Sequence, residues 1–276
     1  MAIFEQADAV LSYDQAGQAG PCVLLVQGAG CIGRGWTPQI DDLARDHRVI
    51  WLDNRGIGSS VPLRGSVTVR DMAQDCQRLM DHMQVERVHA VGHSMGGLIV
   101  QELARLDAQR VSSLSLISTM RRGRDVAVPS LANLRVSMGM LFGSERTRWL
   151  TAARLCFPAP YRATLSDDEA LRWVHMIFCA DFLQQPPIVR KQVAALWHHR
   201  GGDMAALQAI PTLILSGAQD IVVHTRLSDD LKAQLPQARF ERFPDAGHGL
   251  PLQHAHAVNQ RLREHIALAE QRMVSR

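Results

Sequence analysis

The stretch HAVGHSMGG, residues 89–97, decides how the rest of the chain is interpreted. It predicts a short strand over Val88–Val91, a sharp turn at Ser94 and a helix directly after the turn. A G-x-S-x-G sequence in this context is typical of a nucleophile elbow, in which a strained turn lifts a serine hydroxyl clear of a sheet. Gly92 and Gly96 fit such a turn because it leaves no room for side chains two residues from the serine. The helix would direct free N–H groups at the serine, where negative charge would develop.

Strands and helices are predicted to alternate on both sides of this stretch. Strands are indicated at Cys22–Val26, Arg48–Leu52, Val111–Ile117, Thr212–Leu215 and Arg239–Phe243. Apolar residues recur at helical spacing between them, most clearly over Val67–Met83. This alternation favours an α/β fold with a mostly parallel sheet flanked by helices. A short antiparallel hairpin is expected at one edge of the sheet, over Ile3–Tyr13.

The alternation stops between residues 120 and 206. Helices are predicted there at Ser130–Phe142, Glu145–Cys156, Asp167–Cys179 and Pro187–Trp197. We interpret 120–206 as a helical cap inserted over the carboxyl edge of the sheet, and 1–119 with 207–276 as the core. The large apolar side chains of this insertion are expected mostly to pack and partly to line a pocket: Met138, Met140, Phe142, Trp149, Trp173, Phe178, Phe182 and Trp197. Among them Trp173 is the candidate substrate-binding residue.

Ser94 needs a base to take its proton and an acid to orient that base. His248 is the candidate base, because it lies in a glycine-flanked loop after the strand predicted at 239–243. Asp220 is the candidate acid, because it follows the strand predicted at 212–215. Sites of open α/β sheets lie at the carboxyl ends of the strands, so these residues are expected to meet there. Asp245 is the poorer candidate acid, since it is too close in sequence to His248 to face it easily across a loop.

Five motifs follow one another along the chain: QGAG at 27–30, DNRGIGSS at 53–60, GHSMGG at 92–97, SGAQDIVV at 216–223 and DAGHGLPLQ at 245–253. With these motifs the sequence resembles the α/β-hydrolase superfamily over nearly its whole length. The nearest resemblance is to small esterases, enol-lactonases and cofactor-free haloperoxidase-like enzymes. It implies an α/β-hydrolase fold with an inserted helical cap, and its order of triad residues, serine, acid and histidine, is the order found here.

The same resemblance predicts which groups would bind the oxyanion of a tetrahedral intermediate. One donor is the backbone N–H of Met95, directly after the nucleophile. The pair Gln27-Gly28 stands where the family commonly has His-Gly, which makes the N–H of Ala29 the second donor. Gln27 in place of histidine is a departure that leaves the shape of this oxyanion hole open. Gly28 and His93 are candidate substrate-binding residues, and His93 is not expected to act as the base, because it directly precedes the nucleophile.

A second motif competes with this interpretation. The residues Gly28–Gly33 form a G-x-G-x-x-G sequence after a predicted strand, and Asp53 follows about twenty residues later, as in dinucleotide-binding folds. However, the residues 34–38, RGWTP, break the helix that should begin within the glycine motif. Asp53 also opens a D-x-R-G-x-G-x-S loop typical of hydrolases. We therefore expect no NAD, and indeed no cofactor and no metal.

Size and composition set the remaining limits. The chain has 276 residues, of which 46% are hydrophobic, and a net charge of +3. One large core with one inserted subdomain is therefore expected, and no nucleic-acid partner. The five cysteines are scattered without a C-x-x-C pair, which favours a reducing compartment. Neither a signal peptide nor a membrane span is indicated, so a cytoplasmic protein is expected. A homodimer is left open.

These observations predict a serine hydrolase that cleaves a carboxylic ester or lactone through an acyl-enzyme. The expected partner is a small, apolar, ester-like substrate, since tryptophan, phenylalanine and methionine are frequent in the cap. Two alternatives stay open. The same triad could serve C–C bond hydrolysis, or cofactor-free oxygenation or perhydrolysis, because the fold alone does not fix the chemistry. The chain could also be a non-catalytic receptor for a small molecule, which would bind its ligand without turnover.

Overall fold

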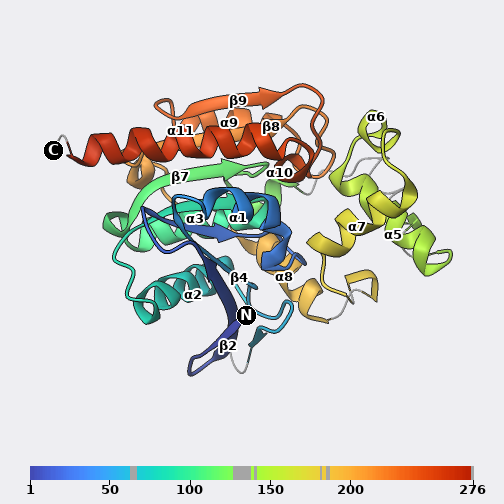
Figure 1. The fold of residues 1–276 in the computed structure, drawn as a ribbon, viewed down its shortest axis with the longest axis horizontal. Helices are drawn as coiled ribbons and strands as arrows, with labels where there is room; N and C mark the ends of the chain where they lie inside the picture. Colours follow the sequence, from blue (N-terminus) through green and yellow to red (C-terminus); the bar gives the residue numbers. More distant parts are fainter. Residues whose placement is uncertain (63–66, 127–137, 140–141, 181, 185–186, 275–276) are drawn as a thin grey trace.

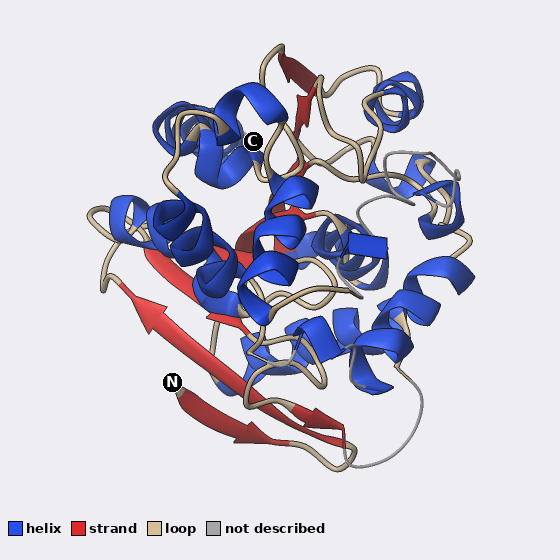
Figure 2. Cartoon of the chain, turned by 90° about the vertical axis from the view of Figure 1, so that its right-hand side faces the viewer, coloured by secondary structure: helices blue, strands red, loops and turns tan. Residues whose placement is uncertain are grey.

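The computed structural model describes residues 1–62, 67–126, 138–139, 142–180, 182–184 and 187–274 (Figures 1 and 2). Within these ranges the strands form one sheet in the order β1-β2-β4-β3-β6-β7-β8-β9, with β5 paired to β2. The pairs β1–β2, β2–β4 and β2–β5 are antiparallel and the other pairs are parallel. The strands are β1 Ala2–Glu5, β2 Ala9–Ala16, β3 Cys22–Val26, β4 Arg48–Leu52, β5 Val61–Pro62, β6 Val88–His93, β7 Val111–Ile117, β8 Thr212–Gly217 and β9 Arg239–Phe243.

The predicted strands and the edge hairpin are confirmed. The strands β3, β4, β7 and β9 have the predicted bounds, whereas β6 and β8 each extend two residues further at the carboxyl end. Both extensions lead toward predicted catalytic residues: β6 ends directly before Ser94, and β8 ends three residues before Asp220. The fold is the predicted α/β architecture.

Helices cover both faces of the sheet, as the alternation of side chains along each strand requires. In β3, Leu24 and Val26 belong to one apolar cluster, while Val23 and Leu25 belong to a second cluster on the opposite face. The first cluster packs against α2, α3 and α9, and the second against α1, α10 and α11. These helices are α1 Thr37–Leu43, α2 Val69–His82, α3 Met95–Leu106, α9 Arg226–Gln234, α10 Leu250–Gln253 and α11 Ala255–Val274. No helix in the described ranges combines the length and apolar character that a membrane crossing needs.

Within the described ranges, four α-helices with defined bounds lie between β7 and β8, in the segment predicted to be a cap, and we refer to them as the cap helices. They are α5 Glu145–Cys156, α6 Ala159–Arg162, α7 Asp167–Ile177 and α8 Pro187–His198. In Figure 1, α5, α6 and α7 stand beside the sheet, past the ends of its strands. Their shared apolar cluster includes Trp149, Phe157, Val174 and Phe178. The aromatic rings of Phe178 and Phe182 stack with their centroids 4.1 Å apart.

The segment between β7 and β8 differs from the prediction in several details. Residues 130–137 and 140–141, most of the helix predicted at Ser130–Phe142, lie outside the described residues, as does Met140. The helix predicted to end at Cys179 ends at Ile177, because Phe178 adopts an extended backbone. The prediction of packing or pocket-lining side chains is wrong for Met138, Phe142 and Trp197, which are exposed. Trp197 shares the outer face of α8 with Val193, also exposed and four residues earlier.

Candidate active site

The predicted turn at Ser94 has the geometry of a nucleophile elbow. Ser94 has φ 56° and ψ −122°, a strained conformation for a residue with a side chain, directly between β6 and α3. Its backbone N–H donates to the carbonyl of Ile117 over 3.0 Å, and its carbonyl accepts from Thr119 Oγ1 at 2.6 Å. A Cβ at Gly92 would lie 2.4 Å from the carbonyl oxygen of Gly96, so a side chain there would collide with the backbone. The Ser94 residue itself is half-buried.

Asp220 and His248 are in direct contact. His248 Nδ1 lies 2.7 Å from Asp220 Oδ2. The other carboxylate oxygen, Oδ1, accepts hydrogen bonds from the backbone N–H groups of Val222 and Val223, each at 2.8 Å. The Asp220 side chain has no exposed surface, so these three contacts fix its orientation. With Nδ1 held by the carboxylate, the Nε2 atom of His248 is left to act on another group.

His93 supports the loop that carries His248. Its Nε2 lies 2.8 Å from the backbone carbonyl oxygen of His248, and the two imidazole rings have centroids 4.7 Å apart. Burial and the neighbouring His248 lower the pKa of His93 to about 3, so the ring is neutral at working pH. A carbonyl only accepts, so the proton of the neutral ring must lie on Nε2. His93 therefore holds the His248 loop, and only 7% of its surface is exposed.

The loop between β3 and the 3-10 helix η1, Gly33–Trp36, passes directly against the serine. A Cβ at Gly28 would lie 3.0 Å from the Cβ of Ser94. Gln27, which stands where the family commonly has histidine, folds back so that its Oε1 accepts from the N–H of Gly28 at 3.2 Å. In the part of the chain that the structure describes, the backbone N–H groups of Ala29 and Met95 have no protein acceptor. Both predicted oxyanion donors are thus free to bind another group.

Gln192 was not predicted from the sequence, although it joins α8 to the loop that follows β3 and to the loop that follows β4. It lies on α8 and is fully buried. Its Oε1 accepts from the N–H of Gly30 at 2.9 Å, and its Nε2 donates to the carbonyl of Arg55 at 3.0 Å. No local motif marks it, because both contacts span more than 130 residues of sequence. Gln192 thereby fixes the end of the loop that contains Ala29.

We predict that Gln192→Leu destabilises the protein and slows its reaction together. The substitution leaves the buried N–H of Gly30 and the buried carbonyl of Arg55 without a partner, which costs about 1–3 kcal/mol for each group. Chemical denaturation and kcat/KM of the variant measure the two effects. The matched control is Lys191→Leu on the exposed neighbouring position of α8. Unchanged stability and kcat/KM in Gln192→Leu would contradict this role.

A second serine–histidine–carboxylate set lies at the amino ends of β6 and β7. His89 Nδ1 is 2.9 Å from Ser113 Oγ, and His89 Nε2 is 3.0 Å from Glu270 of α11. Ser113 is 1% exposed and lies within a strand, so no substrate can reach its hydroxyl. Burial lowers the pKa of His89 to about 4. This set joins α11 to the sheet and provides an internal control for Ser94.

The residues of the dinucleotide-like motif are engaged within the protein. Asp53 Oδ1 accepts from the backbone N–H of Gly33 at 2.7 Å, and Asp53 is 3% exposed. The segment after the glycines forms the 3-10 helix Gly33–Trp36, and α1 begins only at Thr37. The carboxylate that would bind a ribose therefore holds the glycine loop instead.

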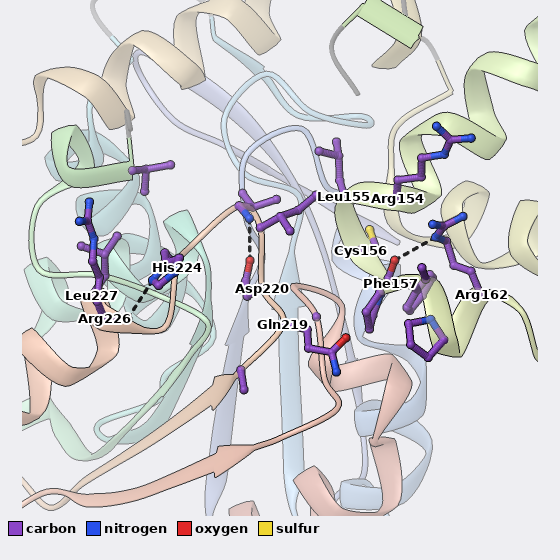
Figure 3. Close-up of a pocket in the computed structure, with 18 of the residues that line it drawn as sticks. Arg154, Leu155, Cys156, Phe157, Arg162, Gln219, Asp220, His224, Arg226 and Leu227 are labelled. Carbon is purple, nitrogen blue, oxygen red and sulfur yellow. Dashed lines mark hydrogen bonds between the residues drawn. The ribbon is translucent and has the colours of Figure 1, made fainter. Parts of the chain in front are cut away.

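A cavity of about 860 Å³ is lined by Asp220, the residue that contacts His248 (Figure 3). Its walls come from the end of α5, from α6, from the segment after β8 and from Gly247. Asp220 and Gly247 line it, but Ser94, His248 and Trp173 are not among the residues of its wall. Trp173 packs against the apolar cluster of the cap helices. The cavity therefore adjoins the candidate triad without containing the serine.

The chain belongs to the α/β-hydrolase fold family, whose model matches residues 21–255. It is 30% identical over 247 residues to the "Putative carbamate hydrolase RutD" of Azorhizobium caulinodans, covering 87% of this chain and 89% of the relative. A solved structure of a thermophilic esterase from Thermogutta terrifontis is 26% identical, with a TM-score of 0.74 over 95% of this chain and 94% of that chain. The enol-lactonase from Burkholderia xenovorans, at 22% identity, shares the fold with a TM-score of 0.76 over 94% of this chain and 97% of that chain.

Proposed function

We propose that this protein is a serine hydrolase that cleaves a carboxylic ester or lactone. The observation that carries the proposal is the 2.7 Å contact between His248 Nδ1 and an Asp220 carboxylate fixed by two backbone N–H groups. This pair lies at the same sheet edge as the half-buried, left-handed Ser94. An orienting acid, a base with one free ring nitrogen and a strained serine are the parts that activated acyl transfer requires.

In the proposed reaction, His248 Nε2 takes the proton of Ser94 Oγ as that oxygen attacks the substrate carbonyl. The N–H groups of Ala29 and Met95 bind the oxyanion of the tetrahedral intermediate. His248 then gives the proton to the leaving alcohol, which leaves an acyl group on Ser94. A water deprotonated by His248 releases the acid and regenerates the serine. Asp220 keeps the imidazole in the required tautomer and stabilises its charged form.

The relatives support this reaction type. Their names describe hydrolysis of a carbamate, an ester and an enol-lactone. Each of these bonds joins a carbonyl carbon to oxygen or nitrogen, so one oxyanion site and one proton-carrying histidine can serve all of them. The unengaged N–H groups of Ala29 and Met95 suit such a carbonyl oxygen.

A substrate panel tests the proposal against the other chemistries open to this site. We expect the wild-type protein to hydrolyse 4-nitrophenyl esters and aliphatic γ-lactones, because the triad attacks a polarised carbonyl. The same panel contains a vinylogous 1,5-diketone for C–C hydrolysis and a peroxide-dependent halogenation assay. Ser113→Ala serves as the matched control and keeps wild-type rates. Turnover of the diketone alone, or no turnover of any compound, would contradict the proposal.

A further inference from the structure

The cavity beside the triad has mostly apolar walls and a volume in the range of small-molecule sites. Its apolar lining comes from the end of α5, from α6 and from the segment after β8, and includes Leu155, Phe157, Pro158, Pro160, Ile221 and Val222. Asp220 and Gly247 also line the cavity. The carboxylate of Asp220 contacts His248, and Gly247 directly precedes His248 in the chain. A ligand in the cavity would therefore lie next to the proposed catalytic base.

The charges on the wall of the cavity are unbalanced. Arg154, Arg162 and Arg226 line it, and none of them forms an ion pair with a carboxylate in the described residues. Its two acidic residues are already engaged: Asp125 pairs with Arg122 at 2.9 Å, and Asp220 binds His248. Among the residues that the structure does not describe, Asp181 is the single one with an acidic side chain. The cavity therefore has an excess of positive charge.

Two of these arginines lie on one side of the cavity, Arg162 half-buried and Arg154 exposed. Figure 3 shows Arg154 and Arg162 on the same side of the cavity, with Arg226 on the other side. Burial and the positive charge of Arg154 lower the pKa of Arg162, so the two guanidinium groups repel each other. Arg162 Nε donates to the carbonyl of Phe157 at 3.1 Å, which holds the side chain while its terminal nitrogens stay available. An anion between the two groups would remove their repulsion.

We propose that this cavity binds a carboxylate of the substrate between Arg154 and Arg162. The preferred substrate is then an ester or lactone with an apolar acyl chain that ends in a carboxylate. This inference rests on the proposed function and departs from the small apolar substrate expected from the sequence, because the apolar wall takes the chain while the arginine pair takes a charged end. The carbonyl that Ser94 attacks lies outside the cavity, at the other end of the chain.

Paired substrates test the proposal. The 4-nitrophenyl monoesters of glutaric acid and of pentanoic acid have acyl chains of five carbons and differ by the terminal carboxylate. We expect wild type to have at least about a tenfold higher kcat/KM for the glutarate ester, chiefly through KM, because charge-assisted hydrogen bonds to guanidinium are strong. Arg154→Gln/Arg162→Gln should lose this preference, and Arg154→Lys/Arg162→Lys should keep part of it. The control is Arg172→Gln on the exposed surface of α7, away from the cavity wall.

A binding measurement separates failure of this inference from failure of the proposed function. Calorimetry with Ser94→Ala, which needs no turnover, compares pentanoate with uncharged pentanamide. Tighter binding of pentanoate, lost in the double glutamine variant, supports the carboxylate site even if no ester is hydrolysed. Ester hydrolysis without a preference for the glutarate ester, together with equal binding of pentanoate and pentanamide, would overturn the inference and leave the hydrolase proposal intact. An equal loss of preference in Arg172→Gln would also overturn it.

Discussion

Ser94→Ala is expected to lower kcat for a 4-nitrophenyl ester by about 10,000-fold or more. Alanine removes the attacking oxygen, and the remaining groups can only bind the substrate and stabilise the oxyanion. The backbone strain at φ 56° is the same for both side chains, because each has one Cβ. The unfolding free energy should therefore stay close to that of wild type. Steady-state kinetics and denaturant unfolding measure the two quantities on the same samples.

The control for this variant is Ser113→Ala. Ser113 also has a histidine and a carboxylate nearby, but its side chain is buried and cannot reach a substrate. We expect the control variant to keep its turnover and to lose some stability through the hydrogen bond to His89. Near-wild-type turnover in Ser94→Ala would show that another group attacks the substrate.

Asp220→Asn is expected to reduce kcat by about 1,000-fold to 10,000-fold while the protein stays folded. An amide oxygen can still accept from the N–H groups of Val222 and Val223, so the loop after β8 keeps its hydrogen bonds. The amide nitrogen that replaces Oδ2 would then face His248 Nδ1 as a donor, which favours the wrong tautomer and removes the charge that stabilises the imidazolium. The kcat values at several pH values measure the loss.

Asp245→Asn is the matched control, because Asp245 lies three residues before His248 and its carboxylate is 3.1 Å from His254 instead. It should retain most of its activity. If Asp245→Asn caused the larger loss, the assignment of Asp220 as the orienting acid would be wrong.

Much of the fold could be predicted because local patterns specify it. The run Cys22–Val26 is wholly apolar, whereas Val111–Ile117 combines four apolar residues with three serines; both are short, and each becomes a central strand of the sheet. Ser94, Asp220 and His248 could be proposed because each follows a strand within a short motif, and parallel strands bring their carboxyl ends to one edge. The contact between Asp220 and His248 agrees with this reasoning.

Other features could not be predicted, because they depend on contacts between distant segments. Gln192 looks like any polar residue of a helix until α8 docks on the loops of Gly30 and Arg55. The support that His93 gives to the His248 carbonyl follows from the packing of the end of β6 against a loop 155 residues away in the sequence. The cap was predicted less well than the sheet, because its apolar residues do not all point inward, as the exposed Phe142 and Trp197 show.

The most direct test of the account is the intact mass of the protein after treatment with a fluorophosphonate, followed by peptide mapping. This reagent reacts with an activated serine and requires no knowledge of the substrate. We predict one adduct on Ser94 in wild type and in Ser113→Ala, none in Ser94→Ala, and much slower formation in Asp220→Asn. No adduct on folded wild-type protein, or an adduct that persists in Ser94→Ala, would contradict the proposal that Ser94 is the nucleophile.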